Sequence, residues 1–151
     1  MVTGLPYRFK LRATNEVGYV ESTNFAEFVV ASVPLAPPTP PSQNFAYTDR
    51  DHVRIEYSAL TSSPAVSSAL ATDGGSAVLS YDLWRDDGLG GDFSTLYSQA
   101  SSQSILALTF ADFKVQEGVT YRYKYRARNI NGWGDFSGVG YLFAAAKPDQ
   151  P

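Results

Sequence analysis

Three carboxylates in one short glycine-rich stretch are the first residues whose type and spacing could do chemistry. Asp86, Asp87 and Asp92 share a run of seven residues with three glycines. Oxygen ligands gathered on such a loop could bind Ca²⁺. The run lacks the spacing of an EF-hand, however, and Asp beside Gly is also the ordinary composition of a turn. We therefore predict a hairpin turn, with these three residues as a weak candidate calcium site.

The other residue types that enzymes use are scarce. The sequence has no cysteine, which removes thiolate metal sites, disulfides and cysteine nucleophiles together. Its single histidine, His52, is expected at the surface where a strand begins. A pair of acids for glycoside hydrolysis would need a cleft, which no part of the sequence builds. We predict no cofactor and no enzymatic activity.

A second candidate site combines cations with tryptophan rings. Near the C-terminal end, aromatic residues alternate with cations, and successive side chains of a strand point to opposite faces. If the aromatic residues point into a core, Arg122, Lys124 and Arg126 point outward. Trp84 and Trp133 could stack on these cations, each contact contributing roughly 0.5–1 kcal/mol. We favour a stabilising stack; a solvated face, and a patch that binds another module or an acidic glycan, stay open.

The composition favours an all-β fold. Of the 151 residues, 14% are aromatic, with ten Tyr and nine Phe, and rings fit the pleated surface of a sheet. The net charge of −3 argues against a nucleic-acid partner, which would need a basic face. No apolar run approaches the roughly 20 residues of a membrane span, so we expect no membrane contact by this segment.

Apolar residues that alternate with period two predict seven short strands. The predicted strands begin with Phe45 and Tyr47 and continue at 53–57, 81–83, 93–98, 105–110, 121–129 and 139–146. Seven short strands separated by turns are typical of a β-sandwich made of two antiparallel sheets.

The sequence repeats itself at a spacing of 114 residues. The stretch 7–15 returns without a gap as 121–129, and several glycines and prolines follow the same shift. The chain is therefore expected to hold the end of one module, 1–33, and one complete module, 42–147.

A proline-rich linker is predicted between the two copies. Residues 34–41 contain five prolines, and such a segment forms a semi-rigid extended spacer, here of roughly 25 Å. Residues 148–151 are predicted to begin the next linker. A Pro-rich ligand for an SH3-type domain is the less favoured interpretation of 34–41.

The first copy supplies only two strands, and an isolated hairpin is marginal in water. Something must therefore cover Tyr7, Phe9, Leu11 and Phe28. Insertion into a neighbour's incomplete sandwich would do so, but the following copy has all seven predicted strands and no vacancy. We interpret 1–33 as a piece of a longer array of like modules.

The clearest repeated strand carries a family resemblance. Its pattern is Tyr121-x-Tyr123-x-Tyr125-x-Ala127-x-Asn129, followed by Gly132 and Ser137. It resembles the sixth strand of fibronectin type III modules, and the stretch 80–83 resembles their third strand. The resemblance implies an immunoglobulin-like sandwich with Tyr121 as a tyrosine corner, its hydroxyl bonded to backbone just upstream. Tyr7 would have the same role in the partial copy. Phe113 occupies roughly the place of the Leu that precedes the family's Tyr, with two extra residues between. Two features depart from the family: Tyr57 stands where a buried Trp is usual, and the loop before the third strand is long.

A Ser/Thr-rich loop adds a candidate modification site. The stretch 61–80 holds eight Ser or Thr residues, which invite O-glycosylation in a secreted chain. The candidate acceptors are Thr61, Ser62, Ser63, Ser67, Ser68 and Thr72. We favour a plain insertion over a glycosylated loop.

This fold hosts many roles, so the fold alone does not indicate a function. We therefore predict the function from the repeated organisation of the chain. We expect a non-catalytic structural or adhesive repeat of a large extracellular or cell-surface protein, such as a fibre, coat or filament. Its partners would be neighbouring modules, like chains in a filament, and glycans. The alternatives are the ligand-binding ectodomain of a receptor and an accessory module of a secreted carbohydrate-active enzyme.

Overall fold

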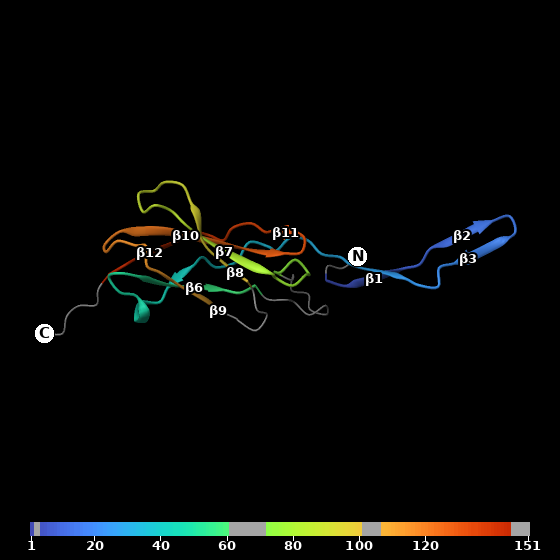
Figure 1. Ribbon diagram of the computed structural model, residues 1–151, viewed down its shortest axis with the longest axis horizontal. Coiled ribbons are helices and arrows are strands. Elements are labelled where there is room, and N and C mark those ends of the chain that lie inside the picture. The colour runs from blue at the N-terminus through green and yellow to red at the C-terminus, as the bar shows by residue number, and fades with distance from the viewer. Residues whose placement is uncertain (2–3, 61–71, 101–106, 146–151) are drawn as a thin grey trace.

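The computed structural model describes residues 1, 4–60, 72–100 and 107–145. It consists of a long N-terminal hairpin and a β-sandwich, and the hairpin extends away from one end of the sandwich (Figure 1). Within the described residues, the only helix is a 3₁₀ turn near the start of the sandwich. The architecture is all-β, as predicted.

Four short strands make the N-terminal hairpin. β1 (Pro6–Phe9) pairs with β4 (Ala26–Val29), and β2 (Arg12–Asn15) pairs with β3 (Gly18–Glu21), both antiparallel. Every residue of β2, β3 and β4 is exposed. The hairpin thus has backbone pairing but no covered core face in the part of the chain described.

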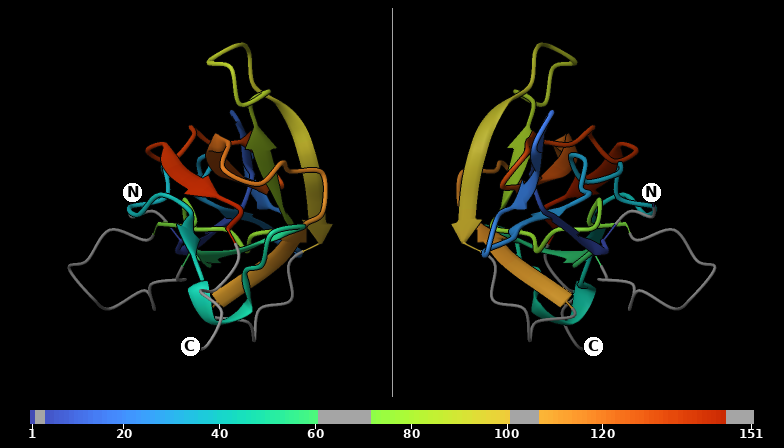
Figure 2. Two further views of the ribbon diagram at one scale, coloured as in Figure 1. Left: turned by 90° about the vertical axis from the view of Figure 1, so that its left-hand side faces the viewer. Right: turned by 90° about the vertical axis from the view of Figure 1, so that its right-hand side faces the viewer.

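One sheet of the sandwich has three strands. β5 (Ser42–Gln43) pairs with β6 (Val53–Ser58), and β6 pairs with β9 (Ala107–Asp112), both antiparallel. Three residues of β6 are buried, and they alternate with more exposed ones as the sequence predicts. This sheet forms one of the two layers seen end-on in Figure 2.

The second sheet is built around β10 (Thr120–Asn129). β7 (Ser80–Arg85) pairs with one edge of β10, and β8 (Ser94–Ala100) pairs with β7. β12 (Gly140–Phe143) and β11 (Gly132–Trp133) pair with the two ends of the other edge. Since β11 and β12 share one edge of β10, they are two halves of one last strand. The sandwich therefore has the predicted seven strands in two antiparallel sheets.

Tyrosine rings fill the space between the sheets. The ring centroid of Tyr57 lies 4.9 Å from that of Tyr125 and 6.4 Å from that of Tyr81. These three residues are at most 3% exposed, and Leu83 and Tyr123 are fully buried beside them. Tyr57 is therefore a core residue at the position where the family usually has a Trp.

The predicted first strand at Phe45 and Tyr47 is wrong. Residues Phe45–Tyr47 form the 3₁₀ helix η1, and both aromatic side chains are more than 60% exposed. The physical reason is Asn44, whose side-chain oxygen accepts a hydrogen bond from the backbone N–H of Ala46 at 3.0 Å. Such a cap stabilises a turn in place of a strand. Pairing with β6 is made by Ser42–Gln43, just before the turn.

The proline-rich segment 34–41, which the composition predicts to be a semi-rigid extended spacer, packs along the sandwich. Three of its five prolines are buried, Pro34 and Pro41 among them. Their carbonyl oxygens lie so close to Gly134 and Gly140 that a β-carbon at either glycine would be 2.2 Å away. The segment therefore lies against the last strand of the sandwich, where residues without a side chain allow this contact.

The 114-residue repeat of the sequence is also a repeat of strand register. Tyr7 pairs with Phe28, and Tyr121 pairs with Leu142, so both partners shift by 114. The pairings at the tips of the two hairpins are related by the same shift. The hairpin and the last part of the sandwich are thus two copies of one structural unit.

Candidate functional site

The outer face of β10 carries the predicted row of cations. Arg122, Lys124 and Arg126 alternate with fully or nearly buried residues, because the strand turns every second side chain to the opposite face. All three cations are partly buried themselves. They lie among aromatic rings from β7, from the loop before β8 and from the segment after β11.

Arg126 has the most ring contacts of the three cations. The centre of its guanidinium group lies 4.6 Å from the ring centroid of Trp133, 4.8 Å from that of Phe136 and 5.4 Å from that of Trp84. Asp82 lies on this face too but is only 6% exposed, with a carboxylate oxygen 3.5 Å from Arg126. The guanidinium group is thus enclosed by three rings and one carboxylate.

Lys124 lies in a cage of rings. Its ammonium nitrogen is 4.2 Å from the ring centroids of both Phe93 and Phe136 and 5.9 Å from that of Trp84. Arg122 continues the row, with its guanidinium centre 4.9 Å from Phe93. Cations and rings therefore interleave along the whole outer face of the strand.

We call these side chains the cation–aromatic face. Its members are Trp84, Phe93, Arg122, Lys124, Arg126, Trp133 and Phe136. Phe93, just before β8, and Phe136, between β11 and β12, are the members that the predicted stack did not include. The spacing of Phe136, three residues after Trp133, is the signal that could have found it. Each contact of this kind contributes roughly 0.5–1 kcal/mol at exposed sites, so the face covers and stabilises the sheet.

The aspartates of the glycine-rich turn have separate partners. Asp86 forms an ion pair with Arg122, with 2.7 Å between a carboxylate oxygen and the guanidinium Nε. Burial raises the pKa of Asp86, but hydrogen bonds from the Arg122 backbone and side chain and from Gly88 outweigh it and lower the pKa. Asp87 accepts hydrogen bonds from two N–H groups of its own loop, which lower its pKa.

The calcium site considered from the sequence is not formed. Among residues 4–60, 72–100 and 107–145, no three acidic or histidine side chains gather in a way that could hold a metal ion. Asp86 is committed to Arg122, and Asp92 is exposed at the end of the turn. The stretch acts as a turn, and it also anchors one cation of the cation–aromatic face.

A buried ion network joins the two sheets, and sequence reasoning missed it. Asp112 at the end of β9 is 1% exposed, and its Oδ2 accepts hydrogen bonds from the Tyr123 hydroxyl at 2.9 Å and from Arg85 at 2.7 Å. Its Oδ1 accepts from the backbone N–H of Lys114. Burial, together with the Asp112 carboxylate, raises the pKa of Tyr123. No spacing signal links these residues, because they lie on three strands far apart in the chain.

Tyr121 lies in the core with its hydroxyl at a backbone group just upstream. It is 5% exposed, and its hydroxyl oxygen accepts a hydrogen bond from the Gln116 N–H at 3.1 Å. Tyr7, the related residue of the hairpin, is partly buried in β1. Phe113, which occupies roughly the place of a Leu in the family, is 68% exposed.

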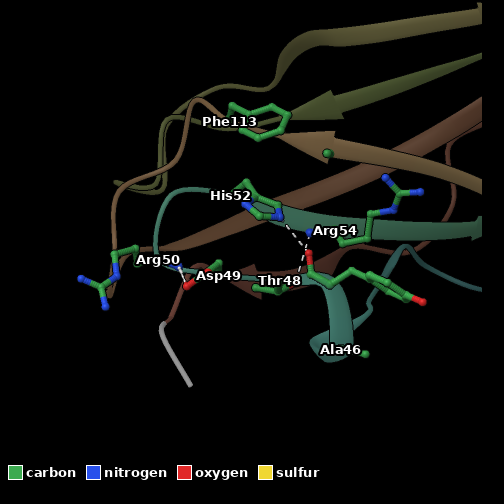
Figure 3. Close-up of a pocket in the computed structure, with 9 residues that line it drawn as sticks. Ala46, Thr48, Asp49, Arg50, His52, Arg54 and Phe113 are labelled. Carbon is green, nitrogen blue, oxygen red and sulfur yellow. Dashed lines mark hydrogen bonds between the residues drawn. The ribbon is translucent and has the colours of Figure 1, made fainter. Parts of the chain in front are cut away.

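The single histidine lines a hollow of about 580 Å³ at one end of the sandwich, beside Phe113 (Figure 3). The ring centroids of His52 and Phe113 are 5.1 Å apart. The Nδ1 of His52 lies 2.6 Å from an Asp51 carboxylate oxygen, and its Nε2 lies 2.9 Å from the carbonyl oxygen of Tyr47. Both ring nitrogens already have partners, so the hollow offers no unengaged imidazole for proton transfer.

Most of the candidate glycosylation sites lie outside the described residues. Thr72 is described; it is partly buried, and its carbonyl oxygen accepts a hydrogen bond from the Leu35 N–H at 3.0 Å. The positions outside the description are Thr61, Ser62, Ser63, Ser67 and Ser68.

In the part of the chain that the structure describes, no helix has the length and hydropathy needed to cross a bilayer.

Solved structures with the same strand arrangement decide the fold. A fourth FNIII domain of a human protein matches with a TM-score of 0.56 at 16% identity, over 82% of this chain and 90% of that one. The chain has the fibronectin type III fold. Domains A168–A170 of titin match with a TM-score of 0.60 at 18% identity, over 90% of this chain and 40% of that one.

The fibronectin type III fold also matches across tandem domains. The FN1–FN3 domains of chicken CNTN1 match with a TM-score of 0.59 at 16% identity, over 97% of this chain and 46% of that one. This chain thus spans less than half the length of the titin and CNTN1 structures. No protein-family model matches the sequence. At these identities the likeness shows the fold alone.

Proposed function

We propose that this chain is a non-catalytic repeat unit, structural or adhesive, in an array of fibronectin type III modules outside the cell or on its surface. The observation that carries the proposal is the burial at positions related by the 114-residue shift. Tyr123 is fully buried, whereas its counterpart Phe9 is 46% exposed. Leu142 is 4% exposed, whereas Phe28 is 61% exposed. The same structural unit has a covered core face in one copy and a bare one in the other.

The exposed aromatic face of the hairpin is expected to be covered by further strands. We assign residues 1–33 to a preceding module, whose other strands would lie on Phe9 and Phe28. We assign 42–147 to a complete module and 148–151 to the start of the next linker. The coverage of 97% of this chain by tandem domains, against 82% by a single domain, supports the assignment.

The cation–aromatic face recurs at the same shift. The guanidinium centre of Arg12 lies 4.4 Å from the ring of Tyr19, as that of Arg126 lies 4.6 Å from Trp133. A stack present on each module would stabilise each in the same way, which suits an array that spans distance. We expect neighbouring modules, like chains in a filament, and acidic glycans as partners.

Scattering and labelling of the parent protein test this proposal. In small-angle X-ray scattering, we expect the maximum dimension to grow linearly with the number of repeats in the chain. A dimension typical of a compact particle of equal mass would contradict the array. An antibody against 34–145 should label intact cells, and labelling only after permeabilisation would contradict the location. Mass spectrometry for hexose on peptides from 61–80 would test the glycosylated loop.

A further inference from the structure

The chain between the hairpin and the sandwich is bonded to the turn that precedes β7. The backbone N–H of Ser32 donates to the carbonyl oxygen of Gly74 at 2.9 Å. The backbone N–H of Leu35 donates to the carbonyl oxygen of Thr72 at 3.0 Å. Two main-chain bonds therefore hold the joint at this turn.

Asparagine amides hold the same joint from the end of β10. Asn129 is 1% exposed, and its Nδ2 donates to the carbonyl oxygens of Ser32 at 2.7 Å and Asp73 at 2.9 Å. Its Oδ1 accepts from the Asn131 N–H at 2.8 Å, which fixes the direction of the amide. The Asn131 side chain also donates to the Ser32 carbonyl, at 3.3 Å. A buried amide with all these bonds is costly to displace.

The joint is also a close contact that only glycine permits. A β-carbon at Gly74 would lie 2.5 Å from the carbonyl oxygens of Ser32 and Val33. Gly4, at the base of the hairpin, faces the neighbouring Gly75, with 3.6 Å between its β-carbon position and the Gly75 Cα. The end of the hairpin is thus recognised through its main chain.

The far end of the sandwich repeats the main-chain bond found at the base of the hairpin. The Gly4 N–H donates to the Val30 carbonyl at 2.7 Å, and the Gly118 N–H donates to the Ala144 carbonyl at 3.0 Å, with both partners shifted by 114. A β-carbon at Gly118 would meet no atom within 4 Å, whereas one at Gly4 would meet Gly75. The position equivalent to Gly4 is therefore open in the described part of the chain.

We propose that residues 72–75 with Asn129 and Asn131 form a docking surface for the C-terminal end of another module of the same kind. The module's own end, at Gly118, belongs to the complementary surface for the module that follows. The inference rests on the proposed array and adds that its joints are fixed in angle. Because the contact is made to main-chain atoms, it depends on the strand register and on the glycines at the joint. We therefore expect the same contact at every joint between modules that keep this register and these glycines.

The variant Gly74→Ala tests the joint in the 151-residue chain, with Gly90→Ala as a matched control. Both glycines have positive φ, +74° and +83°, so both substitutions carry a similar backbone strain. A β-carbon at Gly90 meets nothing within 4 Å, so only Gly74→Ala blocks the joint. The readout is hydrogen exchange at the amides of Ser32 and Leu35. We expect protection by about tenfold or more in the wild type and in Gly90→Ala, and its loss in Gly74→Ala.

Two results would overturn the docking of the hairpin end. They are unprotected exchange at Ser32 in the wild-type chain, and protection kept in Gly74→Ala. The complementary surface is tested by adding a second copy of 34–147 after residue 147, which preserves the spacing of 114. We expect the NMR signal of the Gly118 amide to shift in the extended chain and to return when the added copy carries Gly74→Ala. An unchanged signal would overturn this surface, yet the array would stand as freely hinged modules whose scattering dimension still grows with their number.

Discussion

Removing one hydroxyl from the buried ion network tests how the two sheets are held together. Tyr123 is fully buried, and its hydroxyl donates to the Asp112 carboxylate at 2.9 Å. Tyr123→Phe deletes this donor and keeps the ring. Hydrogen bonds to charged groups contribute about 1.5–3 kcal/mol, so we expect a loss of about 2 kcal/mol in unfolding free energy. Arg85 and the Lys114 N–H still hold the carboxylate in the variant.

Tyr125→Phe is the matched control. Tyr125 is also fully buried, but its hydroxyl donates to a neutral acceptor, the carbonyl oxygen of Ser58, at 3.0 Å. A neutral hydrogen bond contributes about 1 kcal/mol. The two variants remove the same atom from equally buried rings and differ in the charge of the acceptor. We therefore expect Tyr123→Phe to cost about 1 kcal/mol more.

Urea unfolding followed by tryptophan fluorescence measures both losses. Both tryptophans, Trp84 and Trp133, lie in the sandwich, so the signal reports its unfolding and not that of the hairpin. The midpoints should shift with an unchanged dependence on denaturant. Equal losses, or a larger loss in Tyr125→Phe, would refute the reasoning from the charged acceptor. Asp112→Asn should cost more than either, about 3–5 kcal/mol, since it leaves the Arg85 cation without its counter-charge.

Three further predictions concern pH and the cation–aromatic face. The pKa of Asp86 is lowered in the fold, so its stabilisation is present above pH 3.8 and is lost as pH falls through the folded value. Asp86→Asn should flatten the acid limb of unfolding free energy against pH, and an unchanged limb would speak against its pairing with Arg122. Burial raises the pKa of Tyr125 to about 12 from 10.0, so stability should be full below pH 10 and decline as pH rises toward 12. Tyr125→Phe should show a shallower alkaline decline in circular dichroism, and an identical decline would count against this origin. Lys124→Met keeps the stem but removes an ammonium 4.2 Å from two rings, which should cost about 1 kcal/mol. The same change at the exposed Lys114, Lys114→Met, should cost less than about 0.5 kcal/mol, and equal losses would contradict a cation–π contribution.

Alternation along single strands was enough to predict the core and the all-β sandwich. The side chains of a strand alternate between faces by local geometry alone, so Val53, Ile55 and Tyr57 could be assigned to one buried face. The repeat could also be predicted from the sequence. Two stretches that are similar at a constant spacing of 114 residues are expected to form strands with the same register. The exception was the first strand, where the side chain of Asn44 stabilises a 3₁₀ turn.

An insertion of one residue shows the limit of ungapped comparison. The hydroxyl of Ser22 accepts from the Leu11 N–H, and that of Ser137 accepts from the Tyr125 N–H, both at 3.1 Å. The two serines are 115 residues apart, although their partners are 114 apart. The shared hydrogen bond shows that Ser22 and Ser137 are equivalent residues. A comparison of the two copies at a constant shift of 114 residues does not align them.

By itself, the sequence determined the period of the strands, the repeated unit and the row of cations on β10. Each of these depends on neighbours in the chain or on similarity between two stretches. Only the tertiary structure decided that Asp112, Arg85 and Tyr123 meet, that Phe93 and Phe136 enclose Lys124, and that the prolines lie against the last strand. These contacts join residues from separate strands and loops, and their distances depend on how the sheets stack and how the loops return. Local propensity and spacing carry no information about such distances, so the same sequence patterns fit an extended spacer and a solvated face equally well.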